Sequence, residues 1–159
     1  TVRLFSESNE KIATGSGYGF KRNLNPGEET PVYILIKNCP PFTRFESVHT
    51  PEYPYVIPED GIFKNLFKAE ISGTVIKPGK IKNSYVLKGK IYNRTSSNAK
   101  FVQVAVILYN KEKKAIRYAS TYISEKNLEP GDYDYFQINF HTVNGVPDHY
   151  KIFYDGNIN

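Results

Sequence analysis

The chain repeats itself, and this repeat constrains the fold more than any other feature. Shifting the 159-residue sequence by 104 positions places residues 1–36 on residues 105–140 without a gap, and ten of the 36 positions are then identical. Self-similarity at a fixed offset indicates one structural unit built twice. The identical pairs are Val2/Val106, Leu4/Leu108, Ile12/Ile116, Ser16/Ser120, Tyr18/Tyr122, Asn23/Asn127, Leu24/Leu128, Pro26/Pro130, Gly27/Gly131 and Ile34/Ile138.

The second copy carries the pattern of a β domain. Apolar residues from Val102 to Leu108 alternate with Gln103, Ala105 and Ile107, the period of two that marks a strand. Residues 132–140 alternate in the same way, and this predicts one polar face and one apolar face. The polar face carries Tyr133, Tyr135, Gln137 and Asn139, and the other carries Asp134, Phe136, Ile138 and Phe140.

Further strands are predicted over residues 67–75, 84–93, 115–123 and 150–154, with turns at residues 110–114 and 128–131. No helical period runs through the chain. Many short strands at this spacing predict an all-β fold, an immunoglobulin-like antiparallel β-sandwich in one and a half tandem copies.

The half copy defines the expected domains. Residues 1–60 form the C-terminal half of a first repeat plus a connector containing Pro51, Pro54 and Pro58, and residues 61–159 form a complete second repeat, with the boundary near Asp60-Gly61. The first copy begins inside a strand, so it lacks partners for one edge and one apolar face. This predicts self-association or a protein partner at the N-terminal half-domain.

Charge and hydropathy narrow the classes of partner. The formal net charge of +5 indicates a mild preference for anionic surroundings such as cell-wall polymers or lipid headgroups, and the alternative is that the lysines are simply solvated. The densest basic run, Lys111-Glu112-Lys113-Lys114, contains its own acid and sits in a turn, so no nucleic-acid partner is expected. No apolar stretch is long enough for a transmembrane segment.

No catalytic, metal or cofactor site is expected. The three histidines, His49, His141 and His149, lack metal-ligand spacing. The single cysteine, Cys39, begins a proline-rich loop, and the run from Gly15 to Gly19 lacks the following Lys-Ser/Thr of a phosphate loop and reads as a strand loosened by glycine. Asn93-Arg94-Thr95 fits an N-glycosylation sequon, which matters only in a eukaryotic or archaeal secretory setting.

The aromatic content is the strongest hint of a binding site, with 13 Tyr and 10 Phe residues. Tyr133 and Tyr135 share a strand face, and Tyr118 and Tyr122 lie on a nearby strand. These four tyrosines are the candidate binding residues, because a row of exposed phenol rings can contact sugar rings or a protein partner. The alternative is aromatic packing across strands, which stabilises any sheet.

Two motifs resemble the FxLYD domain family, which is named for a Phe-x-Leu-Tyr-Asp strand and often has a Leu-x-Pro-Gly turn before its last strands. The strand motif is Val106-Ile107-Leu108-Tyr109-Asn110, where Val and Asn replace Phe and Asp, and the turn is Leu128-Glu129-Pro130-Gly131. The first copy departs further at Val2-Arg3-Leu4-Phe5-Ser6 but keeps Leu24-Asn25-Pro26-Gly27.

The resemblance implies an immunoglobulin-like sandwich of secreted or surface-anchored prokaryotic proteins, without catalytic activity. We therefore expect a non-enzymatic extracytoplasmic module that mediates protein interaction or spacing at a cell envelope. The alternative is recognition of a glycan or cell-wall polymer through the tyrosine face.

Overall fold

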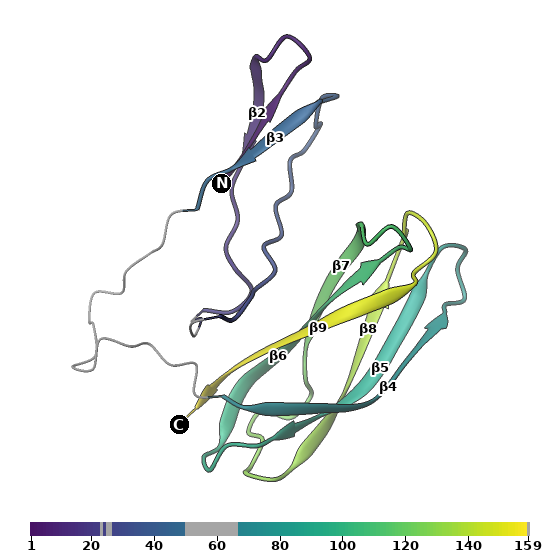
Figure 1. Cartoon of the computed structure of the whole chain (residues 1–159). Helices are drawn as coiled ribbons and strands as arrows, with labels where there is room; N and C mark the ends of the chain where they lie inside the picture. Colours follow the sequence, from purple (N-terminus) through teal and green to yellow (C-terminus); the bar gives the residue numbers. More distant parts are fainter. Residues whose placement is uncertain (23, 25–26, 50–66, 159) are drawn as a thin grey trace, which may run out of the picture. The chain divides into compact units, whose positions relative to one another are not determined.

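The protein is an assembly of β-strands throughout the part of the chain that the structure describes, residues 1–22, 24, 27–49 and 67–158 of a computed structural model (Figure 1). The all-β prediction is confirmed. None of the described segments is a helix long and apolar enough to cross a bilayer. The strands are β1 (Val2–Phe5), β2 (Lys11–Gly15), β3 (Arg44–Ser47), β4 (Ala69–Pro78), β5 (Tyr85–Asn93), β6 (Ala99–Tyr109), β7 (Ala115–Tyr122), β8 (Tyr133–Phe140) and β9 (His149–Ile158).

The chain divides into two compact units. Unit 1 comprises Thr1–Phe20 and Thr30–Phe63, and unit 2 comprises Lys21–Glu29 and Lys64–Asn159. The predicted boundary at Asp60-Gly61 and the proline-rich connector lie outside the described residues.

Unit 2 is built from two antiparallel three-stranded sheets, ordered β4-β5-β8 and β7-β6-β9. Each sheet has one apolar face because its strands alternate in the sequence, and the two apolar faces share one core. The predicted faces of β8 are confirmed, since Phe136, Ile138 and Phe140 are buried while Tyr133 and Tyr135 are exposed. The fully buried residues of the core include Leu87, Ile91, Val104, Val106, Leu108 and Phe140.

Residues 21–29 belong to unit 2 although the sequence repeat assigns them to the first copy. Glu29 pairs with Lys151 on β9, and hydrogen bonding between the two lowers the pKa of Glu29 and raises that of Lys151. The backbone N–H of Arg22 donates to a carboxylate oxygen of Asp155 at 3.3 Å. These contacts attach the segment to the last strand, so a single cut in the sequence does not separate the units.

Asn93, the last residue of β5, is the buried polar centre of unit 2. Its side-chain amide donates to the backbone carbonyls of Ser97, at 2.8 Å, and Leu128, at 2.9 Å. Its side-chain oxygen accepts from the backbone N–H and the hydroxyl of Thr95. The Asn93 sequon noted in the sequence is therefore closed in the folded protein, because the amide nitrogen that would carry a glycan is buried and already bonded.

The described part of unit 1 contains a single three-stranded sheet, ordered β2-β1-β3, whose pairing matches that of β7-β6-β9 in unit 2. Leu4 lies opposite Ala13 and Leu108 lies opposite Arg117, and both pairs are followed by a register shift at the next residue. The turn glycines Gly27 and Gly131 share a φ of 82°, a left-handed conformation that favours glycine. The local geometry thus recurs at the 104-residue offset of the sequence repeat.

The other sheet of the sandwich has no described counterpart in unit 1. Residues 29–36 align with β8, but the described part of unit 1 forms no strand there beyond an isolated bridge between Gly19 and Val32. In unit 2, β8 is held by its antiparallel partner β5. A strand needs such a partner for its backbone groups, and among the described residues of unit 1 no segment takes the place of β5.

Leu108 offers a direct test of the assigned core. Its side chain is fully buried, so Leu108→Ala should lower the free energy of unfolding by about 2–5 kcal/mol. Tyr109→Ala should cost less, because Tyr109 is partly exposed and stacks on His149 at the sheet surface. Denaturant unfolding followed by circular dichroism measures both, and equal small losses would contradict the assigned faces.

Asn93→Asp should destabilise unit 2 by more than about 2 kcal/mol. In the wild type the Asn93 amide donates to two backbone carbonyls, and in the variant a carboxylate oxygen would face those same carbonyls without a hydrogen to donate. Asn139→Asp is the matched control on the exposed face of β8, and it should change stability by less than about 0.5 kcal/mol. Thermal unfolding of both variants decides the point, and a wild-type melting curve for Asn93→Asp would refute the role of this amide.

Candidate functional site

The clearest cluster of functional side chains lies on the outer face of sheet β4-β5-β8. In the register of β5 and β8, Lys90 lies opposite Tyr135 and Tyr92 lies opposite Tyr133. All four side chains point away from the core, because their strand neighbours Ile91 and Phe136 point into it. We call Lys90, Tyr92, Tyr133 and Tyr135 the tyrosine–lysine face.

The three rings and the ammonium group contact one another. The ring centroids of Tyr92 and Tyr133 are 5.2 Å apart, and those of Tyr133 and Tyr135 are 5.6 Å apart in an edge-to-face arrangement. The Lys90 nitrogen lies 4.6 Å from the centroid of Tyr133 and 5.1 Å from that of Tyr135, within the range of cation–π attraction. Packing against the rings therefore holds the ammonium group in place at the surface.

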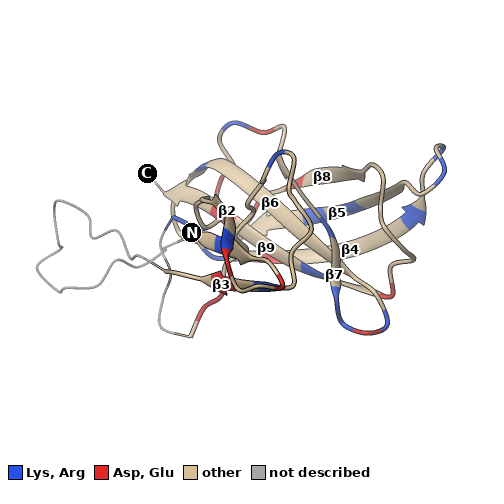
Figure 2. Cartoon of the chain, turned by 90° about the horizontal axis from the view of Figure 1, so that it is seen from above, with Lys and Arg blue, Asp and Glu red and all other residues tan. Residues whose placement is uncertain are grey.

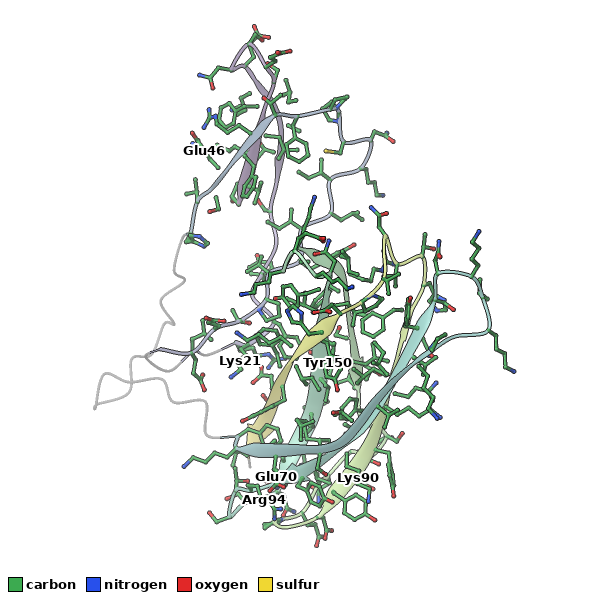
Figure 3. The ribbon with its side chains drawn as sticks, turned by 45° about the vertical axis from the view of Figure 1, so that its right-hand side comes forward. Lys21, Glu46, Glu70, Lys90, Arg94 and Tyr150 are labelled. Atoms are coloured by element: carbon green, nitrogen blue, oxygen red, sulfur yellow. The ribbon has the colours of Figure 1, made fainter. Side chains whose placement is uncertain are left out.

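Arg94 and Glu70 border this face, and Figure 3 shows both at the same end of the sheet as Lys90. The Arg94 guanidinium lies 4.9 Å from the centroid of Tyr92 and forms an ion pair of 2.7 Å with Glu70. Lys90 differs, since none of the ion pairs among the described residues includes it. Its charge is thus offset only by ring faces and hydroxyl groups.

Electrostatics keep the face cationic at neutral pH. Hydrogen bonding with the Tyr135 side chain raises the pKa of Lys90 above its ordinary value. The same hydroxyl group, by hydrogen bonding, raises the pKa of Tyr133. Lys90 is therefore charged and Tyr133 neutral across the physiological range.

A groove continues from this face along the same sheet. It has a volume of 520 Å³ and is lined by Gly73, Val75, Lys77, Pro78, Val86, Lys88 and Gln137. A bulge in β4 between Ser72 and Val75, with Gly73 at a φ of 59°, bends the strand beside it. Figure 2 shows basic residues on both β4 and β5, the strands that contribute Lys77 and Lys88.

The four tyrosines predicted as one site do not form one face. Tyr133 and Tyr135 lie together as predicted, whereas Tyr118 and Tyr122 lie on β7, in the other sheet. They pair with Ile107 and Gln103, which alternate with the inward-facing valines of β6, so they point outward on the opposite side of the sandwich. The four rings are divided because β7 and β8, although consecutive in the chain, belong to different sheets.

Sequence reasoning missed Lys90 and Tyr92. The signal was present, since Lys88, Lys90 and Tyr92 alternate with Leu87, Gly89 and Ile91 in the predicted strand over residues 84–93. What the sequence lacked was the pairing of this strand with β8, which comes more than forty residues later.

Unit 1 presents a second surface, an apolar groove of 540 Å³. Its lining combines β1 and β3 side chains with the segment aligned to β8: Val2, Leu4, Val32, Tyr33, Ile34, Leu35, Ile36, Cys39, Phe42 and Phe45. We call it the unit 1 groove. The glycine run predicted as a loosened strand borders it, because Ile34 and Ile36 come so close to Gly15 that a β-carbon there would be 2.7 Å from each.

The other reactive side chains make ordinary contacts. The Cys39 thiol is exposed and donates to the Pro40 carbonyl at 3.5 Å. His149 stacks on Tyr109 and bonds to Asp148. Within the described residues, no group of three His, Cys, Asp or Glu side chains is arranged to hold a metal ion.

Comparison with known proteins identifies no relative: no family model, no curated protein and no solved structure matches this chain. The resemblance to the FxLYD family therefore stays a prediction from the two motifs. The surfaces described above have to be interpreted from their own geometry.

Tyr135→Phe tests the electrostatics of the tyrosine–lysine face. Removal of the hydroxyl group should lower the pKa of Lys90 and of Tyr133 toward their ordinary values, because its hydrogen bonds raise both. A raised folded-state pKa adds stability that is present below the unfolded pKa and is lost as the pH rises through the folded pKa. Wild-type stability should therefore fall as the pH rises through the alkaline range, and Tyr135→Phe should make that fall smaller. NMR titration measures both groups, and Tyr122→Phe on the other sheet should leave them unchanged.

Proposed function

We propose that the protein is a non-enzymatic β-sandwich module that binds a β-strand of a partner protein in the unit 1 groove. One comparison carries the proposal: positions that are buried in unit 2 are open in unit 1. Phe136 on β8 is 3% exposed, while the aligned Val32 is 47% exposed.

A second open position, Phe45, corresponds in register to Tyr150, a residue that contacts β4 in unit 2. Tyr150 of β9 pairs with Leu108, and its hydroxyl donates to the Thr74 hydroxyl of β4 at 2.9 Å, across the sandwich (Figure 3). Phe45 of β3 pairs with Leu4 in the same register, yet it is 63% exposed. Exposed large apolar side chains gathered in one groove are typical of an interaction site.

Unit 2 also indicates the chemistry of the bound strand. β5 lies antiparallel to β8 and places Leu87 and Ile91, both fully buried, against the opposite sheet. A strand in the unit 1 groove would pair with the backbone of residues 32–36 and present large aliphatic side chains at alternate positions. Main-chain hydrogen bonds then supply affinity, and the alternating side chains supply specificity.

Placement of this module at a prokaryotic cell envelope is part of the proposal and rests on the resemblance to the FxLYD family. Absence of catalysis rests on the same resemblance and on the chemistry of the described surfaces. These surfaces are an apolar groove and a cluster of rings and cations, and both are suited to holding a partner.

A labelled peptide with the sequence of residues 84–93 is the test, because in unit 2 this strand occupies the equivalent position. The full chain should bind the peptide saturably in fluorescence anisotropy, with new hydrogen-exchange protection at residues 32–36. A peptide carrying Leu87→Asp and Ile91→Asp should not bind, since the burial of aliphatic side chains drives the association.

Two protein variants complete the test. Phe45→Asp should abolish peptide binding. Phe101→Asp is the control, because it alters a side chain of similar exposure, 67%, in unit 2, and it should leave peptide binding intact. Binding that survives Phe45→Asp would place the peptide elsewhere and refute the proposal. A concentration-dependent dimer that Phe45→Asp dissociates would identify a second copy, and not another protein, as the occupant.

A further inference from the structure

A second binding surface lies in unit 2, and it does not depend on the proposed function. We propose that the tyrosine–lysine face and the groove beside it together bind an acidic polysaccharide. The inference rests on the placement of cations, rings and amide groups along one open sheet.

The surface is long enough for a polymer. From Tyr92 to Val86 the outward positions of β5 span six residues, about 20 Å at the usual rise of an antiparallel strand. The tyrosine–lysine face occupies one end of this span and the 520 Å³ groove occupies the other. Successive sugar rings of an extended chain can follow the strand direction from one end to the other.

Three lysines on this surface lack an acidic partner. Lys77, Lys88 and Lys90 take part in none of the ion pairs among the described residues, and Lys88 and Lys90 are two positions apart on β5. Cations held near one another repel, and an anion between them relieves the repulsion. Ring contacts that position Lys90 also reduce the entropy lost when its ammonium group is fixed by a ligand.

Polar and aromatic groups suit hydroxyl-rich rings. The Gln137 amide donates to the Asn139 side-chain oxygen at 3.2 Å, which orients both amides on the exposed face of β8. Each amide keeps further donors or acceptors for sugar hydroxyls. Tyr135, 59% exposed, offers a rigid ring with a polar tip against which an apolar sugar face can pack.

The ring geometry favours a glycan over a nucleic acid. Single strands bind to aromatic platforms on which successive bases stack. Here the planes of Tyr133 and Tyr135 meet at 83° and those of Tyr92 and Tyr133 at 41°, so the rings form no common platform. Arg94, which contacts the Tyr92 ring, is already paired with Glu70.

Polygalacturonate, a carboxylate-bearing polysaccharide, is the probe, with dextran as the neutral glycan and an oligothymidylate as the nucleic acid. We expect the full chain to bind polygalacturonate in isothermal titration calorimetry, more weakly as salt is raised, and not to bind dextran. Tyr135→Ala and Lys90→Gln should each weaken binding by about tenfold, the loss expected for one charge-assisted or aromatic contact.

Matched controls separate a site from general attraction by net charge. Tyr122→Ala is the control for Tyr135→Ala, because it removes a ring of the same exposure, 59%, from the other sheet. Lys111→Gln is the control for Lys90→Gln, because it removes one charge from the turn between β6 and β7. Both should bind like the wild type. Unchanged melting temperatures will show that all four variants fold.

Four results would overturn the inference. These are no binding of polygalacturonate, equal losses in the control variants, dextran bound as tightly, or the oligothymidylate bound more tightly than polygalacturonate. Since the probe is a glycan and the variants lie in unit 2, failure here leaves peptide binding in the unit 1 groove as a separate question.

Discussion

Coverage of one apolar sheet face by another is the constraint on which this structure depends. In unit 2 the two sheets exclude water from each other, and residues such as Leu87 on one sheet and Leu108 on the other are fully buried. Among its described residues, unit 1 has the strand order of only one of these sheets, β7-β6-β9. Its strand register around Leu4 is that of unit 2 around Leu108, and yet Val32 and Phe45 stay exposed. Local sequence therefore determines the strand register, whereas burial of the apolar side chains requires a second sheet.

Much of this architecture could be predicted from the sequence because it follows from local patterns. Alternation identified the buried face of β8, and the turn residues identified the reversal at Gly131. The tyrosine–lysine face could not be predicted in the same way. It requires Lys90 and Tyr92 on β5 to meet β8, and strand pairing across such a distance leaves no short-range signal. The separation of Tyr118 and Tyr122 from the β8 tyrosines follows from strand pairing in the same way.

The two proposed surfaces use different physical interactions and are therefore separable. Strand addition in the unit 1 groove depends on backbone hydrogen bonds and apolar burial, which salt affects little. Binding along the outer face of β4-β5-β8 depends on ammonium groups and exposed rings, which salt screens. A module with both surfaces can attach to a polymer and hold a protein at once. Protein interaction and glycan recognition, the two functions expected from the sequence, then become complementary.

The burial of Asn93 has a practical consequence for production of the protein. Enzymes of the eukaryotic secretory pathway modify Asn-x-Thr in the extended chain, before the domain closes. A sugar attached to Asn93 at that moment would remove an amide proton from the bonds to Ser97 and Leu128 and force a bulky group into the core. Secretion from such a host would divide the product into a glycosylated, misfolded fraction and an unmodified, native one. A bacterial host avoids the conflict, whereas Thr95→Ser does not, because Asn-x-Ser is still a sequon.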